Sequence, residues 1–186
     1  MIQKRILKEH RLEEALAWKS KGTVLGMQGE HEEAIMAFDK ALELNPEDSG
    51  AWNNKGVALY DLGEYEEAVR AYDKAIELDP EYFALWNNKG IALAKQREYE
   101  KAIRAFDKAI ELDPEDFVAW NNKGKALAEL GRNEEAIRAY DKAIELNPEY
   151  SDAWNNKGKA LAAQGRDEEA KRAYHKAIEL NPGFCR

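Results

Sequence analysis

One spacing dominates this sequence: tryptophan and proline each recur every 34 residues, in fixed phase, through almost the whole chain. The two series are Trp18, Trp52, Trp86, Trp120 and Trp154, and Pro46, Pro80, Pro114, Pro148 and Pro182. A period of this size indicates one supersecondary unit repeated five times, and so small a unit cannot bury its own apolar face. The core must therefore form between stacked neighbours, which predicts a solenoid whose function lies on a continuous surface.

Each unit has the pattern of two antiparallel helices joined by a tight turn. In the second unit, residues 52–59 place a tryptophan, a glycine and a leucine on one helical stripe, and Asp48 or Ser49 can cap the start of that helix. Gly63 supplies the turn, since glycine tolerates the left-handed backbone that ends a helix. A second apolar stripe follows, and Pro80 stops it and directs the chain to the next unit.

Small residues recur in register on both helices. They are Gly22, Gly56, Gly90, Gly124 and Gly158 on the first, and Ala34, Ala68, Ala102, Ala136 and Ala170 on the second. Glycine inside a helix costs about 1 kcal/mol relative to alanine. Five in register therefore predict close helix crossings that a larger side chain would block. Large rings are expected to fill the remaining space: Phe38, Tyr72, Phe106, Tyr140 and Tyr174.

Taken together, these positions resemble the tetratricopeptide repeat family: Trp, Gly four residues later, Gly at the turn, then Ala, Phe or Tyr, Ala and Pro. The pattern covers residues 15 to about 184. The resemblance implies an all-α, right-handed superhelical solenoid of antiparallel helix pairs, whose first helices line a concave groove. It also implies a non-catalytic scaffold that binds proteins or peptides.

The expected organisation is an N-terminal extension or cap, five repeats and a short tail. The boundaries are 1–14, then 15–48, 49–82, 83–116, 117–150 and 151–184, then 185–186. The extension has a weak amphipathic pattern, formed by Ile2, Ile6 and Leu7 with Lys4, Arg5, Lys8 and Arg11. At the other end, Lys171 and His175 replace an apolar residue and an aspartate, which makes the last helix more polar, as the end of a solenoid requires.

Two further departures from the family pattern concern packing. Lysine stands where the family usually has leucine, at Lys21, Lys55, Lys89, Lys123 and Lys157. We expect each ammonium group to pair with a recurring aspartate of a neighbouring helix, the candidates being Asp39, Asp73, Asp107 and Asp141. Arg97 stands where the other repeats have a turn glycine, so this turn is either strained or differently shaped.

The strongest candidates for function are asparagine pairs that follow the tryptophan in four repeats. An amide side chain both donates and accepts, which suits the backbone of an extended peptide. In related repeat proteins the second asparagine of each pair often lines the groove. The predicted peptide contacts are therefore Asn54, Asn88, Asn122 and Asn156. The alternative is that duplication copied solvated amides along with the repeat.

Three residues after these asparagines, the repeats differ from one another. Val57 and Ile91, helped by Tyr60, make the early part of the predicted groove apolar, whereas Lys125 and Lys159 make the later part cationic. The lysines could hold an acidic or C-terminal segment of a partner, or they could simply keep the surface soluble.

This arrangement is similar in idea to the carboxylate clamp of chaperone-binding family members. Lys19 and Asn54 match two clamp positions, but Thr23, Ala84 and Asn88 occupy the others. Recognition of chaperone tails is therefore not expected.

Composition and residue spacing exclude several classes of function. The net charge of -8 argues against nucleic acid as the main partner. The scattered histidines have no metal-ligand spacing, no phosphate-binding glycine loop is present, and no apolar run reaches membrane-spanning length. We expect no enzyme activity, cofactor or metal, and a cytoplasmic location. The rival hypotheses are a module that stacks end to end on itself and a segment of a longer or designed repeat protein.

Overall fold

The computed structural model describes the backbone of residues 2–185 and the side chains of residue 7 and of residues 9–183. Part of the expected N-terminal pattern, namely the side chains of Ile2, Lys4, Arg5, Ile6 and Lys8, lies outside these residues, as does the side chain of Cys185.

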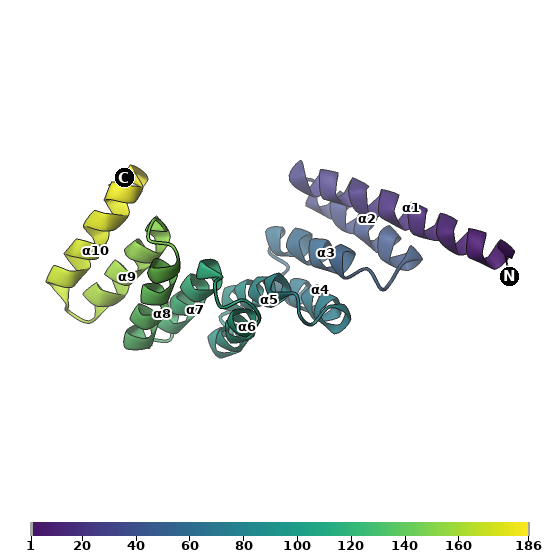
Figure 1. Cartoon of the computed structure of the whole chain (residues 1–186). Helices are drawn as coiled ribbons and strands as arrows, with labels where there is room; N and C mark the ends of the chain where they lie inside the picture. The colour runs from purple at the N-terminus through teal and green to yellow at the C-terminus, as the bar shows by residue number, and fades with distance from the viewer. Residues whose placement is uncertain (1, 186) are drawn as a thin grey trace. The chain divides into compact units, whose positions relative to one another are not determined.

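The described chain is entirely helical, which confirms the all-α prediction (Figure 1). From residue 2 to residue 185 it forms α-helices and one short 3-10 helix, without a strand. The elements are α1 (Ile2–Met27), α2 (His31–Leu44), α3 (Ser49–Asp61), α4 (Tyr65–Leu78), α5 (Phe83–Lys95), α6 (Tyr99–Leu112), α7 (Phe117–Glu129), α8 (Asn133–Leu146), α9 (Ser151–Ala163), α10 (Asp167–Leu180) and the 3-10 helix η1 (Pro182–Cys185).

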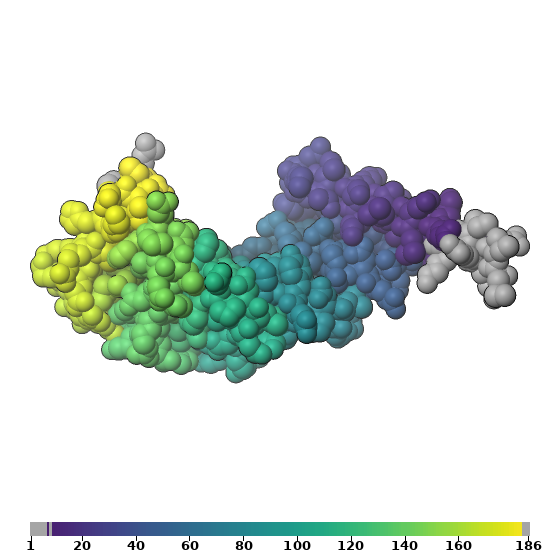
Figure 2. Space-filling model, in the orientation of Figure 1, coloured from purple at the N-terminus to yellow at the C-terminus, as the bar shows by residue number. Residues whose placement is uncertain are grey.

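The helices belong to two compact units, Met1–Gln96 and Arg97–Arg186, and the boundary falls inside the expected third repeat. In the first unit, α1 to α5 each pack on the next helix, and α1 and α5 both contact α3. In the second unit, α6 to α10 pack in the same way, and α7 contacts α9; the side chains of α7 to α10 form one continuous surface (Figure 2). The first helices of successive repeats therefore lie side by side within each unit.

Close contact between a glycine and a ring holds four of the helix pairs together, namely α1–α2, α3–α4, α7–α8 and α9–α10. A Cβ atom built on Gly22, Gly56, Gly124 or Gly158 would lie only 2.5–2.7 Å from a ring carbon of the second helix. The rings are Phe38, Tyr72, Tyr140 and Tyr174. Burial raises the pKa of Tyr72 and Tyr140 far above the ordinary tyrosine value. The glycines thus permit the close crossings expected of them.

The turn inside each repeat uses left-handed backbone. Its glycines have φ between 71° and 84°, and they are Gly29, Gly63, Gly131 and Gly165. Arg97 adopts the same conformation, with φ of 62°. The turn therefore keeps its shape and carries the strain of a side chain in the left-handed region.

The expected cap of the third helix is also present. The Asp48 carboxylate accepts a hydrogen bond from the backbone N–H of Ala51 at 2.9 Å. Asp116 does the same for α7, where it accepts from Val118 and Ala119. Both satisfy N–H groups that have no partner inside the helix.

Two glycines of α1 provide a matched test of the close crossing. We expect Gly26→Ala to raise the free energy of unfolding by up to about 1 kcal/mol, because alanine is the better helix former and the new methyl would lie 3.9 Å from the Cβ of Ala34. Gly22→Ala should lower it by about 1–3 kcal/mol, because its methyl would overlap the Phe38 ring. Urea denaturation followed by circular dichroism measures both, and equal effects would contradict this account of the crossing.

The strained turn gives a second prediction. Arg97→Gly should raise the free energy of unfolding by about 1 kcal/mol, because it removes the cost of a side chain at positive φ. The reciprocal change Gly131→Arg should lower it by a similar amount. Thermal or urea denaturation measures both changes. A destabilised Arg97→Gly protein would show that the arginine side chain stabilises the fold by more than its backbone strain costs.

Candidate functional site

The tryptophan of a repeat ties its helix to the turn that precedes it. Its indole Nε1 donates to the carbonyl oxygen of the proline six residues earlier. The N···O distances are 3.0 Å for Trp52–Pro46, 2.9 Å for Trp86–Pro80, 3.1 Å for Trp120–Pro114 and 3.0 Å for Trp154–Pro148. The joint period of tryptophan and proline therefore reflects one hydrogen bond, whereas sequence reasoning treated the tryptophans only as packing residues.

The recurring lysines join each repeat to the one before it. The pairs are Lys55–Asp39 and Lys89–Asp73, both at 2.5 Å, and Lys123–Asp107 and Lys157–Asp141, both at 2.6 Å. The same ammonium groups lie 5.4–5.5 Å from the centre of the tryptophan ring of their own helix, close enough for a cation–π interaction. The prediction of structural lysine–aspartate pairing is confirmed.

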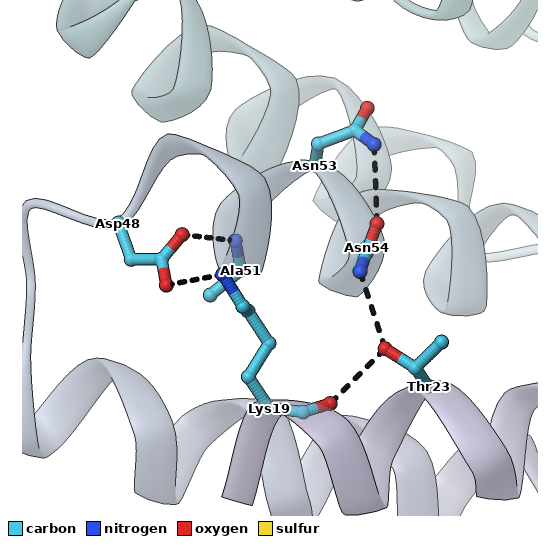
Figure 3. A network of polar contacts seen from close by, with 6 residues as sticks. All are labelled: Lys19, Thr23, Asp48, Ala51, Asn53 and Asn54. Carbon is cyan, nitrogen blue, oxygen red and sulfur yellow. Dashed lines mark hydrogen bonds and ion pairs between the residues drawn. The ribbon is translucent and has the colours of Figure 1, made fainter. Parts of the chain in front are cut away.

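The asparagines of the first unit bond to one another and to the first repeat (Figure 3). Asn54 Nδ2 donates to Thr23 Oγ1 at 3.4 Å, and its Oδ1 accepts from Asn53 Nδ2 at 3.2 Å. Asn88 Nδ2, one repeat further on, donates to Asn53 Oδ1 at 3.1 Å. A chain of amides therefore runs across α1, α3 and α5.

The second unit repeats this arrangement around a buried amide. Asn156 Nδ2 donates to Asn121 Oδ1 at 3.0 Å, and Asn121, only 2% exposed, donates to the Tyr150 hydroxyl at 3.4 Å. Burial raises the pKa of Tyr150, although the bond from Asn121 partly opposes this shift. The first asparagine of a pair is thus a structural acceptor for the second asparagine of the next repeat.

Two of the second asparagines, Asn88 and Asn156, keep hydrogen-bonding capacity for another molecule. Asn88 and Asn156 are half-buried, and within the described chain each uses one of its two N–H groups in the amide bond to the preceding repeat. The other N–H and the amide oxygen can still serve a ligand. Asn122 is half-buried on α7 at the equivalent position.

A cavity of about 260 Å³ opens between α1, α2 and α3. Its lining includes two predicted site residues, Asn54 and Val57, and the latter is 39% exposed. The remaining lining residues are Gly22, Thr23, Gly26, Met27, His31, Phe38, Ala58 and Asp61. The structure therefore places two of the predicted site residues, Asn54 and Val57, in one surface cavity beside the first helices α1 and α3.

The other apolar candidates lie nearby but do not line this cavity. Tyr60 packs its ring on Tyr65, with 5.4 Å between the ring centres. Ile91 is half-buried on α5.

The two candidate cationic residues are in the second unit. Lys125 on α7 and Lys159 on α9 are exposed, and neither makes an ion pair within the described part of the chain. Both lysines lie on first helices of their repeats, and these two helices, α7 and α9, contact each other. They are not placed in the cavity of the first unit.

Within the described part of the chain, no group of three or more His, Cys, Asp or Glu side chains is positioned to hold a metal ion. None of the described helices has the length and apolar character needed to cross a membrane.

The family model for the tetratricopeptide repeat matches the chain in five overlapping stretches, at residues 4–49, 20–83, 53–117, 87–148 and 121–183. The chain belongs to the tetratricopeptide repeat family. No curated protein matches it.

Several solved structures share this tetratricopeptide solenoid. A MamA fragment from Desulfovibrio magneticus RS-1 is 25% identical, with a TM-score of 0.84 over 91% of this chain and 96% of that one. YrrB, described as a tetratricopeptide repeat protein with an unusual peptide-binding site, is 28% identical, with a TM-score of 0.75 over 97% of this chain and 92% of that one. PilF of Pseudomonas aeruginosa, at 24% identity and a TM-score of 0.81 over 92% and 78%, shows the fold alone.

The two residues that match the family's carboxylate clamp have partners inside the chain. Lys19 Nζ lies 2.8 Å from the Asp48 carboxylate that caps α3, and Asn54 bonds to Thr23 (Figure 3).

Sequence reasoning missed four residues that line the cavity: Gly26, Met27, His31 and Asp61. A signal for two of them was available, because Gly26 and His31 stand where the second repeat has Tyr60 and Tyr65. The missing ring at position 26 and the smaller ring at position 31 indicate space that the neighbouring repeat fills.

Proposed function

We propose that this protein is a non-catalytic scaffold that holds an extended peptide or a partner helix against its first helices. The observation that carries the proposal is the cavity between α1, α2 and α3, because it places the amide of Asn54 beside the apolar side chain of Val57. A ligand site usually combines apolar surface with a few polar groups. Here the amide could bond to peptide backbone and the valine could contact a peptide side chain.

The hydrogen-bonding groups that Asn88 and Asn156 do not use within the chain support the same proposal. Asn88 and Asn156 are held in place by their bonds to Asn53 and Asn121, so little side-chain freedom would be lost on binding. The positioned amides can bond to the main chain of a ligand and so give affinity that depends little on the ligand's sequence.

The second unit favours an acidic ligand. Lys125 and Lys159 lie on the side of the first helices without ion-pair partners among the described residues. An acidic or C-terminal segment of a partner would supply carboxylates to both. YrrB is described as having a peptide-binding site, which is consistent with a peptide ligand here.

Stacking of copies end to end is a less favoured alternative. Within the chain, each lysine of a following repeat pairs with an aspartate of the preceding one, as Lys157 does with Asp141. The last repeat has His175 at the aspartate position. A second copy placed there would therefore set Lys21 against a histidine, without the carboxylate that the lysine pairs with elsewhere.

The asparagine hypothesis predicts a difference between two sets of variants. Changing Asn54, Asn88, Asn122 and Asn156 together to alanine should reduce peptide capture at least about tenfold, because several backbone hydrogen bonds are lost. The readout is enrichment from a library of acidic peptides, internal and C-terminal, with circular dichroism to verify folding.

The matched control changes the first asparagines instead: Asn53, Asn87, Asn121 and Asn155. Like the first set, this control loses the hydrogen bonds that Asn88 and Asn156 donate to the preceding repeat. Unlike the first set, it keeps the side chains of the second asparagines. We expect this folded control to keep most of its binding. Equal loss in both sets, or unchanged binding in the first, would show that the asparagines are structural only.

The lysine hypothesis predicts salt-sensitive selection. Lys125→Gln with Lys159→Gln should abolish the preference for acidic peptides and flatten its dependence on salt concentration. Lys142→Gln with Lys176→Gln is the control, since it makes the same charge change on the second helices α8 and α10. Library selection at low and high salt compares the two variants. An acidic preference that survives in the Lys125 and Lys159 variant, or that is lost equally in the control, would refute the assignment.

A further inference from the structure

The first repeat departs from the second at two neighbouring positions. Gly26 and His31 correspond, at 34-residue spacing, to Tyr60 and Tyr65. In the second repeat the two tyrosine rings contact each other at 5.4 Å between centres and 56° between planes. The first repeat has no ring at the Gly26 position to make this contact.

The ring of Tyr60 packs on a cluster that contains Ala68, Tyr72 and Ala92. The equivalent cluster one repeat earlier is formed by Ala34, Phe38 and Ala58, and two of these residues, Phe38 and Ala58, line the cavity. The cavity is therefore the space that the chain's own tyrosine ring fills in the next repeat.

The size and lining of this space suit one aromatic ring. Its volume of about 260 Å³ exceeds the ~150 Å³ of an engineered apolar cavity that binds benzene. The methyl of an alanine at position 26 would meet only Ala34 Cβ, at 3.9 Å. Met27 and Val57, which are 83% and 39% exposed, offer apolar surface at the entrance.

His31, whose side chain is 24% exposed, lines the cavity and carries an unsatisfied polar atom behind its wall. His31 Nδ1 is buried and has no hydrogen-bond partner. The nearest carboxylate oxygen, Asp61 Oδ2, is 3.9 Å away, which is too far for a hydrogen bond. A buried ring nitrogen without a partner is unfavourable, and a phenol hydroxyl can satisfy either tautomer because it donates and accepts.

We propose that this cavity receives a tyrosine side chain of the bound partner, with the ring in the place of Tyr60 and the hydroxyl bonded to His31 Nδ1 once the imidazole ring turns toward it. This inference rests on the proposed peptide-binding function and adds the residue type that anchors the peptide. Phenylalanine would fill the same space but leave the nitrogen unpaired.

The test uses two small probes, p-cresol and toluene, which are the side chains of tyrosine and phenylalanine. Each is titrated into the full chain and followed by amide resonances in two-dimensional NMR. We expect p-cresol to shift resonances around Gly26, His31 and Val57. Gly26→Tyr should abolish these shifts, because it restores the filled arrangement of the second repeat, whereas Gly26→Ala should keep them.

His31→Phe tests the hydroxyl contact, since Tyr65 shows that the equivalent position accepts a six-membered ring. We expect the affinity ratio of p-cresol to toluene to fall about two- to tenfold in this variant, the usual effect of one hydrogen bond. An unchanged ratio, or p-cresol shifts that survive Gly26→Tyr, would overturn the proposal. Because the probes bind without any peptide, such a result would leave the asparagine test of the groove unaffected.

Discussion

Four helix pairs are held by an aromatic ring packed against the backbone of a glycine, and much of the remaining architecture follows from that contact. Because Gly56 has no side chain, Tyr72 can lie directly on its helix, and the two axes approach closely. A pair packed in this way still exposes an apolar edge, which only another pair can cover. The same contact recurs with Phe38, Tyr140 and Tyr174, so every repeat presents its neighbour with nearly the same surface.

Polar bonds accompany the apolar packing at the joints between repeats. A tryptophan fixes the turn through a proline carbonyl, a lysine reaches back to an aspartate, and an asparagine reaches back to the preceding amide, as Asn88 does to Asn53. These bonds are directional, whereas apolar packing is not. They fix the orientation of one repeat on the next and leave the packed residues to supply most of the burial free energy.

Much of this arrangement could be predicted from the sequence, because the period itself gives the helix pair, the turn and the residues that pack. The lysine–aspartate pairs were predictable for the same reason, since both partners recur in phase. The amide chain was not, because Asn88 and Asn53 are 35 residues apart, and their meeting depends on how far one repeat is rotated against the next. The cavity was harder still, because its cause is a ring that is absent at Gly26.

The lysine–aspartate pair has a direction that affects how such a chain can change in length. The cation always comes from the later repeat and the acid from the earlier one, as in Lys89 with Asp73 and Lys123 with Asp107. Loss or duplication of one whole 34-residue period before the last repeat would rejoin an acid to a cation in the same geometry. A change of any other length would break that pairing, so repeat number can evolve in whole steps without redesign of this ion pair.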